Sequence, residues 1–225
     1  MRSQVDLYTN IHKGQRVRFF MISKLAGSLN ANNQNALVEL ENELVSFQEH
    51  MYLHAGHEEK IVHPLLSQRV PGGANRLNED HRIMRKQFEG LVACFSEIKD
   101  KPTDFEKREE QCLEFYLTWN RFLSFYFDHI NYEEEYVMST LWKLCTSDEL
   151  ADTFRKVLAD QTPKELIDSY GMMLPATSPA ERVMILKRGQ ATMPPEVFQG
   201  TLKVAEHVLT PDEWVSVKKI LKLEA

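Results

Sequence analysis

The stretch LVELENELVSFQEHMYLHAGHEEKIVHP, residues 37–64, repeats large apolar side chains at alternating three- and four-residue steps. This spacing places them along one face of an α-helix, like the seam that faces the core of a helical bundle. His54 and Glu58 interrupt that apolar seam, which is predicted to continue through Ile61 and Leu65. A carboxylate and an imidazole buried among Leu, Phe and Met need a partner or a cation. The stretch therefore predicts a bundle helix that carries a polar site in its core.

The same apolar spacing recurs in three further segments, so the first 145 residues are predicted to be all-α. Three short breaks separate the segments: GSLNANN (27–33), VPGGAN (70–75) and KDKPTD (99–104). The predicted helices are 4–26, 33–69, 75–99 and 105–144, and Thr103 to Glu106 has the pattern of a capping box for the last of them. Because short connections make neighbouring helices antiparallel, the predicted fold is an up-down-up-down four-helix bundle.

A different pattern begins after residue 145, where S/T-x-x-E capping boxes recur. They start at Thr146, Thr162, Ser178 and Thr210, and most of them carry proline at the first helical position. Together with MPPEVF (193–198) they predict a C-terminal extension of about five short helices. Their apolar stripes make a thin core, so we expect residues 146–225 to pack on a bundle domain formed by residues 1–145.

Every predicted helix of the bundle carries a histidine on its core-facing seam, and two helices add a carboxylate. The six seam residues are His12, His54, Glu58, His81, His129 and Glu133. In the second and fourth helices the glutamate follows the histidine by four residues, which puts both side chains on one face about 40° apart. His63 falls about 180° from His54 on a regular helix and is predicted to face away from the core.

This set of four imidazoles and two carboxylates, without a thiolate, favours octahedral iron or manganese over a tetrahedral structural zinc site. Two ions bridged by Glu58 and Glu133, each also held by two histidines, would use all six ligands. Positions for a bridging oxygen and for one exchangeable ligand, such as dioxygen, peroxide or nitric oxide, would remain. The alternative is a helical protein that binds a protein partner and whose His–Glu pairs are metal-free or take adventitious zinc.

Two further residues on the first seam are candidates near His12. Tyr8, one turn earlier, is a candidate pocket residue that could donate a hydrogen bond to a bound ligand, and its alternative role is that of an aromatic core residue. Gln15 is a candidate hydrogen-bond partner of a metal ligand, or a residue near solvent at the helix end.

Composition excludes several classes of function. The net charge is −6, and acidic and basic residues are interspersed, so neither nucleic acid nor an anionic membrane surface is an expected partner. No apolar run is long enough to span a membrane, and MRSQVDLYTN does not resemble a signal peptide. The three cysteines lack C-x-x-C spacing and are predicted to be free thiols in a reducing compartment. We therefore expect a cytoplasmic protein.

Four motifs of the chain resemble the hemerythrin-like (HHE) family of four-helix diiron proteins. They are IHKGQR around His12, HAGHEEKIVHP with its H-x-x-x-E-E run, EDH at His81, and HINYEEE as the second H-x-x-x-E-E, and the resemblance covers residues 5–145. It implies an oxo- or hydroxo-bridged pair of irons, for which manganese or zinc are possible substitutes. The implied ligands are the same six residues that the seams select.

The chain departs from the oxygen-carrying hemerythrins at two positions. Those proteins have a second histidine where this chain has Leu77, and they use a carboxylate where it has Glu134. The resemblance therefore implies a diiron protein that binds or responds to dioxygen, peroxide, nitric oxide or iron status. A diiron oxidase or oxygenase acting on a small molecule under the C-terminal helices is the alternative, and the sequence leaves open whether the chain is an enzyme and whether Glu134 replaces Glu133 as a ligand.

Overall fold

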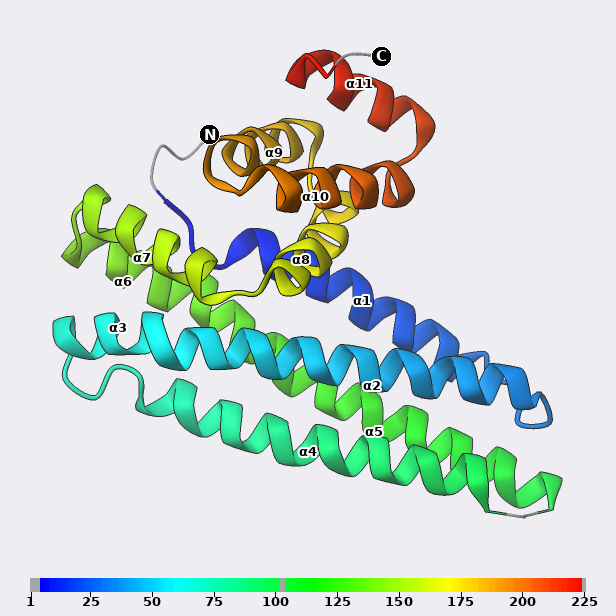
Figure 1. Cartoon of the computed structure of the whole chain (residues 1–225). Coiled ribbons are helices and arrows are strands. Elements are labelled where there is room, and N and C mark those ends of the chain that lie inside the picture. The colour runs from blue at the N-terminus through cyan, green and yellow to red at the C-terminus, as the bar shows by residue number, and fades with distance from the viewer. Residues whose placement is uncertain (1–4, 102–103, 224–225) are drawn as a thin grey trace. The chain divides into compact units, whose positions relative to one another are not determined.

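The structure is a computed structural model that describes residues 5–101 and 104–223, and these residues contain helices and no strand (Figure 1). The predicted all-α class is confirmed. Two compact units are present. One is Arg18–Thr153, and the other combines the described residues up to Val17 with those from Phe154 onward. The domain boundary predicted at residue 145 stays a prediction.

The bundle unit is built from long antiparallel helices. Its elements are α1 (Thr9–Gly27, from Arg18 onward), α2 (Gln34–His57), η1 (Glu58–Val62), α3 (His63–Arg69), α4 (Asn75–Asp100), α5 (Phe105–Tyr132), η2 (Glu133–Val137) and α6 (Met138–Leu144). In Figure 1, α2, α4 and α5 run lengthwise beside one another with alternating direction, as the short connections predict. The bundle predicted from the sequence is thereby observed.

Local hydrogen bonds explain where the helices begin. The Asn33 side chain accepts from two backbone N–H groups of the first turn of α2. Asp104 caps α5 in the same way, whereas Thr103, predicted to begin a capping box, lies outside the described residues. The first helix begins at Thr9 instead of residue 4, because the Asp6 carboxylate accepts from the backbone N–H groups of Tyr8 and Thr9 and holds the chain in a turn.

Aromatic side chains fill the centre of the bundle unit. Phe19 from α1 packs edge-on against Phe47 from α2, with ring centroids 4.6 Å apart. Phe88 of α4 and Trp119 of α5 meet at 5.8 Å, also edge-on. Such pairs combine large apolar burial with favourable ring geometry. Together they fix the spacing of all four helices beside the polar seam residues.

Two short π-helical segments, η1 and η2, interrupt the α-helices, and the regular periodicity did not predict them. Each π turn contains one extra residue, so the core-facing positions after it shift by one. Val62 and Leu66 are buried in place of the predicted Ile61 and Leu65. In the fourth helix, regular spacing places Tyr136, three residues after Glu133, on the core-facing seam. Instead Tyr136 is half exposed and Val137 is buried.

The second unit contains most of the C-terminal helices. These are α7 (Ser147–Asp160, its first half belonging to the bundle unit), α8 (Pro163–Ala176), α9 (Pro179–Thr192), α10 (Pro195–Val208) and α11 (Pro211–Leu221). The four predicted capping boxes are present. This unit has a core of its own, formed by residues such as Tyr170, Leu174, Phe198 and Leu202.

The N-terminal half of α1 belongs to this second unit. Gly14 approaches α8 so closely that a Cβ atom at this position would lie 2.8 Å from the carbonyl oxygen of Met172. Lys13 donates to the Glu181 carboxylate at 2.6 Å. These contacts join the turn of α1 that carries His12 to helices α8 and α9.

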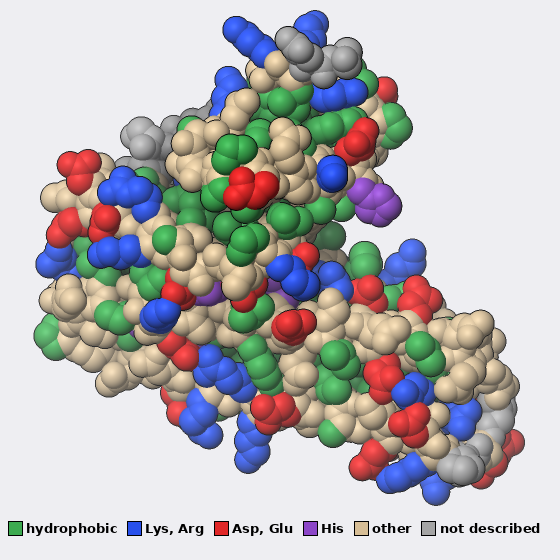
Figure 2. Space-filling view, in the orientation of Figure 1, with side chains coloured by type: hydrophobic (Ala, Val, Ile, Leu, Met, Phe, Trp, Pro, Cys, Tyr) green, Lys and Arg blue, Asp and Glu red, His purple; other side chains and the backbone are tan. Residues whose placement is uncertain are grey.

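Charged side chains of both signs are mixed on the surface of the bundle helices (Figure 2). On the face shown in Figure 2, basic and acidic side chains are interspersed along the bundle helices, without an extended patch of one sign.

The described residues include no helix with both the length and the apolar character that crossing a bilayer requires. None of the three cysteines, all of which are described, forms a disulfide.

Candidate metal centre

Five of the six predicted ligands meet in the core of the bundle unit. The two oxygens of Glu58 face different histidines: Oε1 lies 3.1 Å from His54 Nε2, and Oε2 lies 3.4 Å from His81 Nε2. On α5, His129 Nε2 lies 3.3 Å from an oxygen of Glu133. Both carboxylates are buried, Glu133 completely. The seam pattern therefore identified residues that the fold brings to one place.

The two carboxylates occupy equivalent positions in their helices. Glu58 is the first residue of η1 and Glu133 the first of η2, and each follows its histidine by four residues. π-Helical turns within α-helices are rare and occur frequently at functional sites. Glu133, whose neighbour Glu134 the sequence left as an alternative ligand, is the glutamate that contacts His129.

Carboxylates outside the cluster hold the outer nitrogens of two histidines. His81 Nδ1 lies 3.0 Å from Glu59, which Arg85 contacts at 2.8 Å. His129 Nδ1 lies 3.2 Å from Asp80. A histidine whose Nδ1–H donates to a carboxylate presents the Nε2 lone pair to a metal, and this arrangement is usual among metal-binding histidines. The sequence did not predict these roles of Glu59 and Asp80, because they depend on contacts between helices.

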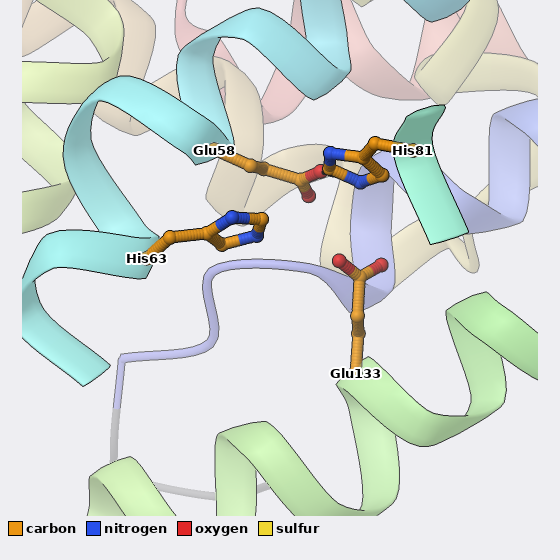
Figure 3. A group of neighbouring side chains, drawn as sticks. All are labelled: Glu58, His63, His81 and Glu133. Atoms are coloured by element: carbon orange, nitrogen blue, oxygen red, sulfur yellow. Dashed lines mark ion pairs between the residues drawn. The ribbon is translucent and has the colours of Figure 1, made fainter. Parts of the chain in front are cut away.

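His63 lies inside the cluster, and the prediction that it faces away is wrong. Its side chain is 3% exposed, its ring stacks on that of His81 with centroids 5.2 Å apart, and its Nδ1 lies 2.7 Å from Asn78 Oδ1. The cause is η1: the His63 N–H bonds to the Glu58 carbonyl five residues earlier, which brings both residues to one face. Figure 3 shows Glu58, His63, His81 and Glu133 pointing toward one another. Each offers a ligand atom, and these atoms lie within 4.8 Å of one another.

Charges within the cluster shift the pKa values of His129 and Glu58. Burial opposes the charged form of His129, but the charge of Glu133 and the hydrogen bond that His129 donates to Asp80 outweigh it and raise the pKa of His129 to about 10. For Glu58 burial is likewise outweighed by the charge of His54, so the pKa of Glu58 lies well below its ordinary value. Protons on imidazoles therefore neutralise the carboxylates when no cation does so. Burial lowers the pKa of His63, which stays neutral.

These residues fit a metal ion. Nitrogen and carboxylate oxygen are the donors that iron and manganese take in octahedral sites, and the cluster contains no thiolate. Two buried carboxylates need positive charge, and the convergent Nε2 atoms are the form in which histidine binds metals. The buried His/Glu cluster is therefore a metal-binding site by its chemistry, without indicating which metal it holds.

The remaining predicted residues lie on or beside the N-terminal half of α1. His12, Tyr8 and Gln15 are all buried, and the rings of Tyr8 and His12 lie 5.6 Å apart. Tyr8 precedes the helix, and its carbonyl accepts from the backbone N–H of His12. The roles of His12 as a ligand and of Tyr8 as a pocket residue stay predictions.

Comparison with known proteins gives one family. A search of the curated proteins gave no match. The family model described as the hemerythrin HHE cation-binding domain matches residues 3–141, which is more than half of the chain. The match includes all four helices that carry the seam histidines, and it agrees with the cluster of buried imidazoles and carboxylates. The chain belongs to the hemerythrin HHE cation-binding domain family.

Proposed function

We propose that this protein is a non-haem diiron protein that binds or responds to dioxygen, peroxide, nitric oxide or iron status. The observation that carries the proposal is the position of Glu58, whose two oxygens face histidines of two different helices, His54 and His81. A carboxylate placed in this way can bind two ions, one on each side. Di-iron carboxylate proteins with four-helix folds use inward-pointing Glu and His side chains in this manner.

The ligand set divides between two ions. On one side, Glu58, His63, His81 and Glu133 offer donor atoms within 4.8 Å of one another. We include His129 on this side because its Nε2 lies 3.3 Å from Glu133. On the other side, His54 is close to Glu58, and we include His12 there because it occupies the matching seam position on α1. Two reasons favour iron over manganese or zinc. The donors are imidazole and carboxylate, and the motifs that carry them resemble those of a diiron family.

Carboxylates next to the cluster would hold the histidines in the orientation that metal binding requires. Glu59 and Asp80 orient His81 and His129 through their Nδ1 atoms. A bound non-haem iron pair would supply redox chemistry and an exchangeable coordination position for a diatomic ligand or peroxide. The imidazoles of His54 and His129, whose pKa values are raised, would give up protons when cations enter.

The experiment is metal analysis of the full chain after anaerobic reconstitution with Fe(II), together with absorption spectra before and after reduction. We expect about two irons per chain and near-ultraviolet bands that change with redox state. Less than about half an iron per chain would contradict the proposal. Oxygen consumption separates the two functional alternatives: a sensor gives at most a single turnover per site, whereas steady, substrate-dependent consumption favours an oxidase.

A further inference from the structure

We propose that His63 is an additional metal ligand, which binds through Nε2 to the ion shared with His81, Glu58 and Glu133. The proposal rests on the diiron function and names a ligand beyond the six that the sequence predicts. It rests on three observations: the backbone of η1, the hydrogen bond at Nδ1, and the surroundings of Nε2.

The first observation is the register that η1 imposes. In a continuous α-helix a residue five positions after Glu58 points to another face, because each residue turns about 100°. Here the His63 N–H bonds to the Glu58 carbonyl in an i→i+5 pattern, so His63 lies nearly above Glu58 on the core face. The second π segment has the same pattern, but there the residue in the corresponding position is Met138, which is a weak ligand for iron. The nitrogen donor is therefore specific to η1.

The second observation is the hydrogen bond that sets the tautomer of His63. Its Nδ1 lies 2.7 Å from the Asn78 side-chain carbonyl oxygen, which can only accept, so Nδ1 carries the proton. His81 and His129 use the same device, with Glu59 and Asp80 as acceptors. Three imidazoles thus have their outer nitrogens held by oxygen acceptors, which directs their inner nitrogens toward the cluster, where a metal ion can bind them.

The third observation is the environment of the inner nitrogen. His63 Nε2 is buried and has no hydrogen-bond partner among the described residues. Its neighbours in the cluster, Glu58 and Glu133, are carboxylates, and an ionised carboxylate accepts hydrogen bonds but cannot donate one. A buried acceptor that faces other acceptors is unfavourable unless a cation lies between them. A metal ion satisfies all of these atoms together.

The test compares the full-length His63→Gln variant with wild type after loading with Co(II) and with Fe(II). His50→Gln is the matched control, since His50 is a half-buried imidazole two turns before Glu58, and desolvation lowers its pKa to about 3. The first readout is the rate at which a chelator removes iron, which we expect to rise at least about tenfold in His63→Gln and to stay near the wild-type value in His50→Gln. The second is the proton NMR spectrum, in which each ligating histidine gives a hyperfine-shifted exchangeable N–H signal.

His63→Gln should lose one of these N–H signals, and circular dichroism checks that the variant is folded. A second variant, Asn78→Leu, keeps every imidazole and removes only the acceptor; it should release iron at a rate between those of wild type and His63→Gln. If His63→Gln retains all the shifted signals and the wild-type release rate while wild type binds two irons, His63 is not a ligand and the diiron function stands. A wild-type chain that takes up no metal overturns both proposals.

Discussion

The Nε2 atoms of His81 and His129 lie 3.1 Å apart and face each other in the core of the bundle. Because both Nδ1 atoms are held by carboxylates, both Nε2 atoms would be acceptors, and such a contact requires a proton or a cation between them. In the absence of metal, His129 supplies the proton, as its raised pKa of about 10 indicates. We therefore expect metal binding at this site to release protons.

This release of protons predicts opposite effects of pH on the metal-free and the loaded protein. The pKa of His129 is raised from 6.5 to about 10 in the folded chain, so its contribution to stability is complete below pH 6.5 and is lost as the pH rises through about 10. Urea unfolding of the metal-free chain at pH 6, 8 and 9.5 should show this decline, and the variant His129→Gln should not. Co(II) affinity should instead rise over the same range, by about tenfold per pH unit for each proton released. A metal-free chain whose stability increases toward pH 9.5 would contradict this account.

Replacement of Glu58 by glutamine should remove both ions. The amide has nearly the same shape but lacks the charge that neutralises His54, and it cannot bridge two metals. We expect almost complete loss of iron and a decrease of about 3–5 kcal/mol in the unfolding free energy of the metal-free chain. Glu59→Gln, one residue later, is the control: it weakens the contacts with Arg85 and with the outer nitrogen of His81 but removes no proposed ligand, so it should retain most of the iron. Full iron content in Glu58→Gln would be incompatible with a bridging role.

We expect Asp80 to influence metal binding through His129, whose Nδ1 lies 3.2 Å from the Asp80 carboxylate. The variant Asp80→Asn keeps the shape but weakens the acceptor at His129 Nδ1, so metal affinity should fall by about 10–100-fold, with the number of ions unchanged. Asp128 provides the control, because it pairs with the same Arg76 but lies exposed and contacts no histidine in the described structure. Competition with a chelator measures the affinities. Equal affinities for Asp80→Asn and Asp128→Asn would show that the histidine does not need its carboxylate.

The aromatic core should account for much of the stability of the bundle unit. Phe47 is fully buried against Phe19 and Phe88, and Phe47→Ala should lower the unfolding free energy by about 3–5 kcal/mol. Leu113 lies on α5 with 58% of its surface exposed, and Leu113→Ala should change the free energy by less than about 0.5 kcal/mol. Chemical denaturation of both variants measures the difference. Similar losses in the two would mean that this core is not packed as described.

Replacement by alanine should have opposite effects on stability at two helical glycines. At Gly14 a Cβ atom would lie 2.8 Å from the Met172 carbonyl oxygen, so Gly14→Ala should push α1 and α8 apart and destabilise that unit. At Gly90 a Cβ atom would meet nothing within 4 Å, so Gly90→Ala should stabilise α4 by about 0.5–1 kcal/mol. Thermal unfolding of the two variants shows whether each substitution raises or lowers the stability. Stabilisation by Gly14→Ala would contradict the close approach of α1 to α8.

Regular periodicity predicted most of the fold. The breaks at residues 27–33, 70–75 and 99–104 separate helices that end within a few residues of the predicted limits, and the C-terminal capping boxes form as expected. Glycine, proline and capping residues act locally, so their effect can be inferred from neighbours in the sequence. The first helix begins later than predicted because Asp6 bonds to the backbone ahead of it.

The site was predicted only in part, and the missing part has a physical cause. His54, Glu58, His129 and Glu133 are recognisable because each pair is spaced by four residues within ordinary α-helix. His63 was missed because the extra residue of a π turn changes the register, and the regular 100° step assumes that no such turn occurs. A signal was nevertheless present: a second histidine follows the glutamate by five residues, which is the spacing that an i→i+5 turn brings to one face.

Anomalous diffraction at the iron absorption edge, from crystals of the reconstituted full chain, would show whether two irons lie on either side of Glu58. We expect two iron peaks per chain, about 3.5–4 Å apart, one on each side of the Glu58 carboxylate. One peak should lie within bonding distance of His81 and Glu133, and the other within bonding distance of His54. No peak in this cluster, or a single peak that Glu58 does not contact, would contradict the account.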